Sequence, residues 1–347
     1  MIIQSLTALR LADTFTQLTT LLKHIATYLC LCLPIAAQAQ TGETDQSSQQ
    51  ASRQTSQWLS ELHSDHPLNG KIWSSAKQDF LSPDQLISLL AEAGILLLGE
   101  KHDNPDHHRL RLIILESLLA SDAPVLIVME MMTQPQQPAL DRLAASDPVP
   151  AANEWQRWLD WDEAWNWEFY QPALGLALQN RTRTRLVAGN ISAETMMAIY
   201  RSEAQADQPL SPDQLAILSE EIDASHCGML PASQIPAMVR VQQARDQQMA
   251  DSLLETGEFA QRILLAGNYH VRHDLSVPNY LNQHDASTTE PLTVMNLAFL
   301  EVDPGLMQAE DYLPAIESGG ADTKPAYDLI WFTPAVRADD YCADLSR

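Results

Sequence analysis

Two apolar runs far apart in the chain end in the same pattern, a glycine followed three positions later by a histidine (GxxH). AGILLL leads into Gly99-Glu100-Lys101-His102, and RILLA leads into Gly267-Asn268-Tyr269-His270. Each run has the length of a buried strand, and the carboxyl ends of parallel strands meet at one crevice where ligands bind. Either histidine alone reads equally well as a loop residue bonded to backbone, but the repetition favours a shared site.

Two more apolar runs end in polar side chains. VLIVM runs into Glu130, and RLVAG runs into Asn190. Segments with helical spacing follow these runs, and LTVMNLAFLEV and YDLIWFTP are expected to form two further strands. This alternation predicts an α/β fold with a mostly parallel central sheet flanked by helices.

The stretch 191–257 reads as helical throughout, which is too long for one simple crossover. We expect it to form a helical insertion over the carboxyl ends of the strands. Arg245 and Asp246 lie on its last helix, where they either face the crevice or are ordinary exposed charges.

The first residues read as an export signal. Lys23 precedes the apolar stretch IATYLCLCLPIAA, and Ala37-Gln38-Ala39 provides the small residues that signal peptidase requires. The stretch is shorter than the roughly 20 residues of a membrane span. We expect a signal peptide over 1–39 and a periplasmic protein. Lipid anchoring is not expected, because neither Cys30 nor Cys32 follows a small residue.

The content of apolar residues distinguishes an expected flexible linker from an expected folded domain. Residues 40–57 are almost devoid of apolar side chains and are expected to be a flexible linker, and 58–347 to be a single α/β domain. The formal charge of −24, with 45 acidic against 21 basic residues, argues against nucleic acid as a partner.

Two cysteines remain after the leader, Cys227 and Cys342. In the oxidising compartment reached by an exported protein two thiols can pair, so we predict a disulfide between them. Two separate free thiols are the alternative.

The strand-ending residues form a chemically capable set. Glu100, His102, Glu130 and His270 are candidates for acid–base catalysis, since imidazole titrates near neutral pH and a carboxylate in a crevice can have its pKa raised. His102, His270 and Glu130 are also suitable ligands for a divalent metal such as zinc. The sequence has no GxSxG elbow, no phosphate-binding glycine loop and no CxxCH haem attachment.

Aromatic residues are concentrated in EWQRWLDWDEAWNWEFYQP. Trp155, Trp158, Trp161 and Trp165 are spaced three or four residues apart, as on one helix. They fit either a helix docked on the sheet or the aromatic wall of a pocket.

Five segments, in order, resemble the ChaN-like haem-binding uptake family of the Tiki superfamily, which also holds the TIKI proteases and the erythromycin esterases. They are ILLLGEKHDNPDHHRLRLIILE, LIVMEMMTQPQQPALDRL, VAGNIS, QQARDQQMADSLL and LLAGNYHVRHDLSVPNYL. The resemblance covers most of the chain after the leader. The superfamily hallmark, paired GxxH motifs and a glutamate, corresponds here to Glu100, His102, Glu130 and His270.

The resemblance implies a periplasmic haem-binding protein of iron or haem uptake. Tyr269, which stands where small residues are usual, and Tyr170 become candidate ligands of haem iron, with Asn190 as a further cofactor contact. Haem or another small molecule is the expected ligand. A haem receptor or transporter in the outer membrane and a homodimer are compatible partners.

The same resemblance leaves an enzymatic alternative, and the sequence does not decide whether the chain is an enzyme. A metal-dependent or acid–base hydrolase would use a glutamate as base and the histidines to bind metal or stabilise charge. A third alternative is an envelope interaction module with a vestigial site.

Overall fold

The computed structural model describes residues 58–202, 209–285, 293–313, 324–338 and 342. The predicted signal peptide and linker, 1–57, lie outside these residues. No helix within the described ranges is long and apolar enough to cross a membrane.

A single mixed sheet of eight strands organises the described residues, in the order β2-β1-β8-β7-β3-β6-β4-β5. The six strands from β8 to β5 are parallel, and β1 pairs antiparallel with β2 and β8. The predicted mostly parallel sheet is therefore confirmed. Its strands are β1 (Ile72–Ser74), β2 (Asp79–Leu81), β3 (Ile95–Leu98), β4 (Val125–Thr133), β5 (Thr184–Asn190), β6 (Gln261–Leu265), β7 (Val294–Glu301) and β8 (Leu329–Thr333).

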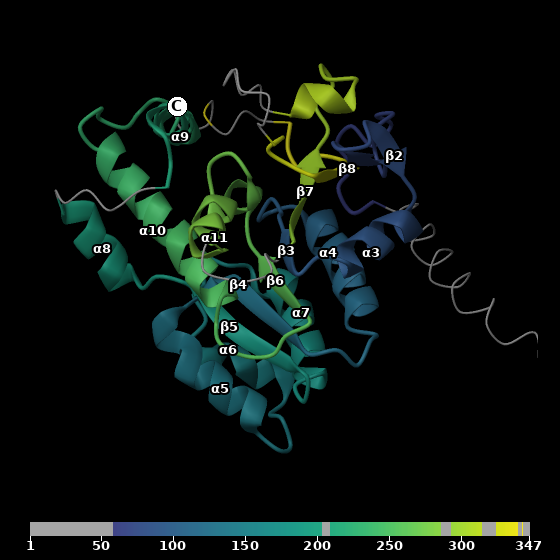
Figure 1. Cartoon of the computed structure of the whole chain (residues 1–347), viewed down its shortest axis with the longest axis vertical. Coiled ribbons are helices and arrows are strands. Elements are labelled where there is room, and N and C mark those ends of the chain that lie inside the picture. Colours follow the sequence, from purple (N-terminus) through teal and green to yellow (C-terminus); the bar gives the residue numbers. More distant parts are fainter. Residues whose placement is uncertain (1–57, 203–208, 286–292, 314–323, 339–341, 343–347) are drawn as a thin grey trace, which may run out of the picture. The chain divides into compact units, whose positions relative to one another are not determined.

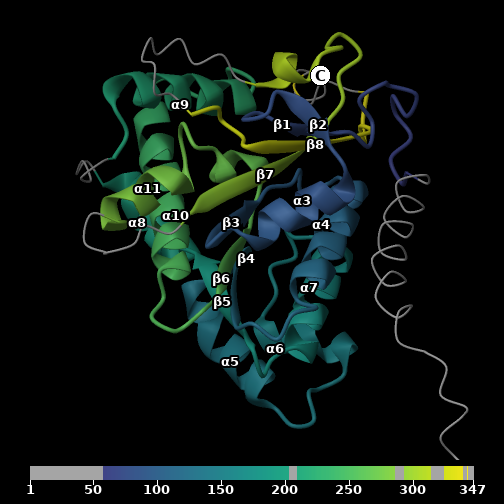
Figure 2. The ribbon, with the colours of Figure 1, turned by 45° about the vertical axis from the view of Figure 1, so that its right-hand side comes forward.

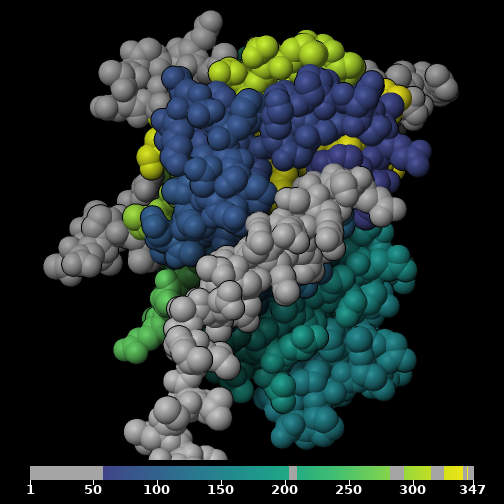
Figure 3. All heavy atoms as spheres, turned by 90° about the vertical axis from the view of Figure 1, so that its right-hand side faces the viewer, coloured from purple at the N-terminus to yellow at the C-terminus, as the bar shows by residue number. Residues whose placement is uncertain are grey.

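Helices cover both faces of the sheet. One face carries α3 (Pro83–Ala91), α4 (Pro105–Leu118), α5 (Gln137–Ala145), α6 (Trp155–Leu159) and α7 (Trp167–Gln179), and the other carries α10 (Ile235–Leu253) and α11 (Val277–Asp285). Figure 2 shows α3, α4 and α7 on one side of the strands and α10 and α11 on the other. Figure 3 shows the outer surface of the first layer, with blue residues of α3 and α4 beside teal residues of α5 to α7.

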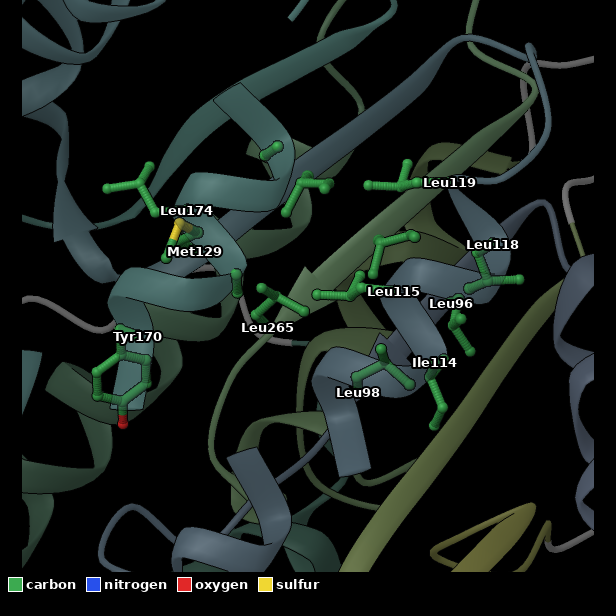
Figure 4. Close-up of a cluster of buried hydrophobic side chains, with 14 of the residues drawn as sticks. Leu96, Leu98, Ile114, Leu115, Leu118, Leu119, Met129, Tyr170, Leu174 and Leu265 are labelled. Carbon is green, nitrogen blue, oxygen red and sulfur yellow. The ribbon is translucent and has the colours of Figure 1, made fainter. Parts of the chain in front are cut away.

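Alternation along the strands builds a core on each face. Leu96 and Leu98 of β3 join the cluster of α4 and α7, whereas Leu97 joins the cluster of α10 and α11. Figure 4 shows Leu96 and Leu98 near Ile114 of α4, with Tyr170 of α7 at the edge of the same cluster. Both faces of the parallel strands are buried, as the continuous apolar runs predict.

A capped turn places the first GxxH motif before α4. Asn104 is the N-cap, and its side-chain oxygen accepts hydrogen bonds from the backbone N–H groups of Asp106 and His107. Pro105 occupies the first helical position, where its missing N–H is of no consequence. The chain therefore turns sharply after β3, and the motif stays at the strand end.

The predicted helical insertion is present between β5 and β6. It consists of α8 (Ala193–Arg201), α9 (Pro212–Ser225) and α10. Figure 1 shows α8 and α9 grouped with α10. The predicted disulfide between Cys227, just after α9, and Cys342 is also formed.

The tryptophan-rich segment differs from the single helix that its spacing predicts. Helix α6 ends at Asp160, whose φ of 48° is left-handed and breaks the helical path. Trp155 lies in α6, but Trp161 and Trp165 lie in the turn before α7. Trp155, Trp161 and Trp165 nevertheless all pack on the same apolar cluster.

Candidate active or ligand-binding site

The two GxxH motifs lie side by side because β3 and β6 are neighbouring parallel strands, with Leu98 paired to Leu265. The backbone N–H of Asn268 donates to the carbonyl oxygen of Glu100 at 2.8 Å, which joins one motif to the other. His102 and His270 line the same cavity. The structure thus brings together the two histidines that the sequence pairs, while their chemical roles remain predictions.

The glycine of each motif makes room for the other motif. A Cβ added at Gly99 would lie 2.3 Å from Oδ1 of Asn268, and one added at Gly267 would lie 2.9 Å from Cε1 of His102. Both distances are far below ordinary van der Waals contact. The glycines are therefore required by close packing between the motifs.

Glu100 is the centre of a buried polar network. Its Oε1 accepts hydrogen bonds from Nδ1 of His102 and from the hydroxyl of Tyr170, both at 2.8 Å. Its Oε2 lies 3.2 Å from Nε2 of His108, and Arg111 lies 3.8 Å from Oε1. Burial alone would raise the pKa of Glu100, but His102 and Arg111 outweigh it and lower the pKa to about 2.

His102 stands between this network and the cavity. Its side chain is 49% exposed and packs edge-on against Trp165, with ring centroids 4.8 Å apart. Burial lowers the pKa of His102, but the hydrogen bond to Glu100 and its charge raise it more, so the net shift is upward. Nδ1 carries a proton and donates it in the hydrogen bond to Glu100. Nε2 is therefore the ring nitrogen available to a ligand.

His270 lies between two carboxylates. Its Nδ1 is 2.6 Å from Oδ1 of Asp246, and its Nε2 is 3.2 Å from Oε1 of Glu130. Burial would lower the pKa of His270, yet the charges of Glu130 and Asp246 raise it to about 10. Near neutral pH His270 is therefore an imidazolium with both ring nitrogens occupied.

Glu130 is held by the second motif as well. Its Oε2 accepts the backbone N–H of Gly267 at 2.8 Å. Burial would raise the pKa of Glu130, but His270 outweighs it and lowers the pKa to about 2. Burial raises the pKa of Asp246, on the far side of His270, to about 6.

Above these groups lies a cavity of about 810 Å³, within the roughly 300–1,000 Å³ of small-molecule sites. Its walls are mainly apolar, and much of the lining comes from the insertion, including Met196 and Met197 of α8, Ile222 of α9 and Met238 of α10. Tyr269 is also one of the lining residues. Its hydroxyl is buried, and no described residue provides a hydrogen-bond partner for it. The cavity thus has mainly apolar walls and a base formed by charged side chains.

Two predicted cofactor contacts lie outside the lining. Tyr170 is 1% exposed, and its hydroxyl donates a hydrogen bond to Glu100, the carboxylate that also binds His102. Asn190 donates its amide to the carbonyl oxygen of Glu130 and accepts the N–H of Ile191. Both side chains serve to position the glutamates.

Some site residues are not identifiable from the GxxH pattern. Asp246 lies on a buried stripe of α10 with Met249, Ala250 and Leu253, and that spacing is the signal that places it inward. His226 lies on the cavity lining beside Cys227, and its only sequence signal is that neighbour.

Within the described part of the chain, no group of three or more His, Cys, Asp or Glu side chains has the arrangement of a metal site. The carboxylates that would complete such a set with His270 instead form ion pairs with its imidazolium. The predicted zinc ligation by His102, His270 and Glu130 therefore stays a prediction. The polar side chains at the base of the cavity can nevertheless exchange a proton at His102 and bind a polar atom of a ligand.

A family model described as haem-binding uptake, Tiki superfamily, ChaN, matches residues 86–281. Among solved structures, ChaN of Campylobacter jejuni, described as binding haem cofacially, is similar with a TM-score of 0.60 and 24% identity. The match covers 67% of this chain and 92% of that one, and it shows the same fold.

More distant matches include a mutant of the erythromycin esterase EreC in its open conformation, with 15% identity and a TM-score of 0.39 over 68% of this chain and 81% of that one. Another is the toxin effector domain RRSP of Vibrio vulnificus, with 13% identity and a TM-score of 0.36 over 62% and 35%. Likeness at this level carries no argument about function. No curated protein sequence matches the chain.

Proposed function

We propose a function from the premise that this chain belongs to the haem-binding uptake family of the Tiki superfamily, the family of ChaN. The chain binds haem in the cavity between the GxxH motifs and the helical insertion, and acts in iron or haem uptake. The related ChaN of Campylobacter jejuni is described as binding haem, which supports this proposal. These comparisons do not favour the hydrolase alternative.

The observation that carries the proposal is the Tyr269 hydroxyl. Tyr269 lines a mainly apolar cavity, and its hydroxyl is buried with no hydrogen-bond partner among the described residues. A buried polar group without a partner is unfavourable, so a ligand that engages it is expected. Haem supplies an iron whose axial positions accept protein ligands, and a tyrosine oxygen is one of these.

The rest of the lining fits an amphipathic, flat ligand. Trp165 provides aromatic surface, and Met196 provides a polarisable thioether. Arg245, whose guanidinium contacts the sulfur of Met196 at 3.7 Å, places a positive charge on the cavity wall. This charge is suited to a haem carboxylate.

The cellular role extends the same proposal. The predicted export signal over 1–39 supports a periplasmic location, where haem would be received from a receptor or transporter in the outer membrane. A homodimer would place two such cavities in one particle. Fractionation of cells and light scattering of the purified protein test the location and the oligomeric state.

Titration of the purified mature protein with ferric haem tests the proposal. We expect a saturable change in the Soret band, with affinity reduced in Tyr269→Phe. Tyr200→Phe is the matched control, because Tyr200 lines the same cavity from α8. Absence of haem binding would contradict the proposal, as would an equal affinity for haem in Tyr269→Phe and the wild type. Stoichiometric zinc lost in the His102→Ala, His270→Ala double variant would also contradict it if haem does not bind.

A further inference from the structure

Strand β5 lies at one edge of the sheet, and side chains cover that edge. Among the described residues β5 pairs with β4 alone. An edge strand presents backbone N–H and C=O groups with which a strand of another molecule can pair. Backbone groups alternate between the two sides of a strand, so those of Leu186 and Ala188 both face the outer edge of β5.

Gln137, the first residue of α5, covers the middle of this edge. Its Oε1 accepts the backbone N–H of Ala188 at 2.7 Å, and its Nε2 donates to the carbonyl oxygen of Leu186 at 3.1 Å. In a parallel sheet, one residue of a neighbouring strand bonds in the same way, to the C=O of one residue and to the N–H two positions later. The Gln137 amide therefore takes the place of one residue of a further parallel strand.

A neighbouring carboxylate orients the Gln137 amide. Its Nε2 also donates to Oδ1 of Asp141, one helical turn further along α5, at 2.8 Å. Asp141 accepts a second hydrogen bond from Arg185 of β5 itself. Because a carboxylate only accepts, Asp141 fixes which end of the amide faces Leu186 and which end faces Ala188.

The two ends of the same edge are covered as well. The N–H of Thr184, the first residue of β5, donates to the carbonyl oxygen of Asn180 in the preceding turn at 3.0 Å. The carbonyl oxygen of Ala188 accepts from the hydroxyl of Ser252 on α10 at 3.4 Å. Helices from both faces of the sheet thus contribute to this cover, and Figure 1 shows α5 next to β5.

The opposite edge of the sheet offers much less to another strand. Strand β2 has three residues, of which Asp79 and Phe80 are exposed, and a short edge with a charged side chain is a poor template for pairing. Strand β5 has seven residues and an uninterrupted apolar run from Leu186 to Ala188. An uncovered β5 edge therefore finds its best match in the β5 edge of a second copy of this chain.

We infer that the Gln137 side chain closes the β5 edge to a second copy of this chain, and that two copies pair through β5 when the amide is removed. The inference goes beyond the proposed function and does not depend on haem, since Gln137 is not among the residues that line the cavity. It explains why an amide side chain at the start of α5 bonds to the backbone of a strand.

Sedimentation velocity of Gln137→Ala over a range of protein concentrations tests the inference. We expect self-association beyond the state that the wild type has at the same concentration. Gln137→Met, which keeps the length of the side chain but forms neither hydrogen bond, should associate as Gln137→Ala does. Gln134→Ala is the matched control, because Gln134 is exposed in the short 3₁₀ helix Gln134–Gln136 before α5, and it should behave as the wild type.

Hydrogen exchange locates the contact between copies. At low concentration the amide of Ala188 in Gln137→Ala should exchange roughly 2- to 10-fold faster than in the wild type, the factor expected for loss of one hydrogen bond. As association proceeds, the peptide 184–190 should become protected, whereas the peptide 79–81 at the opposite edge should not change. Circular dichroism checks that each variant folds.

The inference is overturned if Gln137→Ala and Gln137→Met keep the wild-type state at every concentration. Association without protection of 184–190 overturns it as well, because the copies would then meet at another surface. An Ala188 amide that exchanges at the wild-type rate in both variants would show that the Gln137 side chain does not cover this edge.

Discussion

Replacing Gly99 by alanine should disrupt the contact between the two GxxH motifs. The new Cβ would lie 2.3 Å from Oδ1 of Asn268, 3.0 Å from Cγ2 of Val271 and 3.1 Å from Cα of Asn268. The Asn268 side chain cannot simply turn away, because its amide donates to the carbonyl oxygen of Phe299 at 2.6 Å. The backbone contact remains even if the side chain moves.

The expected loss of stability combines two effects. Overpacking of a filled site destabilises by about 1–3 kcal/mol. Loss of the Asn268 hydrogen bond adds about 0.5–1.5 kcal/mol. Gly99→Ala should therefore lower the free energy of unfolding by roughly 1.5–4.5 kcal/mol. This corresponds to a drop in Tm of roughly 3–18 °C at about 2–4 °C per kcal/mol.

Thermal and urea unfolding of Gly99→Ala beside Gly175→Ala provides the assay. Gly175 lies within α7, and its added Cβ would meet its nearest neighbours at 3.5 Å, an ordinary contact. Because glycine disfavours a helix interior, Gly175→Ala should stabilise by about 0.5–1 kcal/mol. If Gly99→Ala is as stable as Gly175→Ala, the close packing of the motifs is refuted.

Three further predictions follow from the site. The pKa of His270 is raised from 6.5 to about 10, so its contribution to stability is complete below pH 6.5 and is lost as the pH rises toward 10; urea unfolding should show this decline in the wild type and a flatter profile in His270→Gln. Glu100→Gln should lower the pKa of His102, and an unchanged imidazole titration by NMR would contradict the network. Cys227→Ser opens a cross-link between residues 115 positions apart and should cost about 2–5 kcal/mol, measured by urea unfolding; equal stability with and without reductant would contradict it.

The parallel sheet was predictable because its strands are buried on both faces and read as uninterrupted apolar runs. The same reasoning predicts that Glu100 and Glu130 lie close together at the carboxyl-terminal edge of the sheet, since the carboxyl ends of parallel strands lie along one edge. Strands β1 and β2 were not predicted, because each spans three residues and gives no usable periodicity. The end of α6 at Asp160 was equally hidden, since no glycine or proline marks it.

Much of the site depends on tertiary contacts that a linear pattern does not specify. Asp246 belongs to a helix, and only its alignment with buried residues separates it from an exposed charge. Tyr170 looks like a ligand by residue type, yet α7 directs its hydroxyl to Glu100. Spacing predicts which residues reach the strand ends, whereas packing between helices decides which of them face the cavity.

Strand β6 lies between β3 and β4, although it follows both in the chain by more than a hundred residues. During synthesis, β3 and β4 emerge long before the strand that separates them, and each has an unpaired edge until Gln261–Leu265 arrives. Such distant pairing slows folding and leaves the incomplete chain open to association with other chains. A nascent chain that stops before β6 therefore lacks a central strand of its sheet. Until synthesis ends, factors that bind the nascent polypeptide have to keep the exposed edges of β3 and β4 from pairing with other strands.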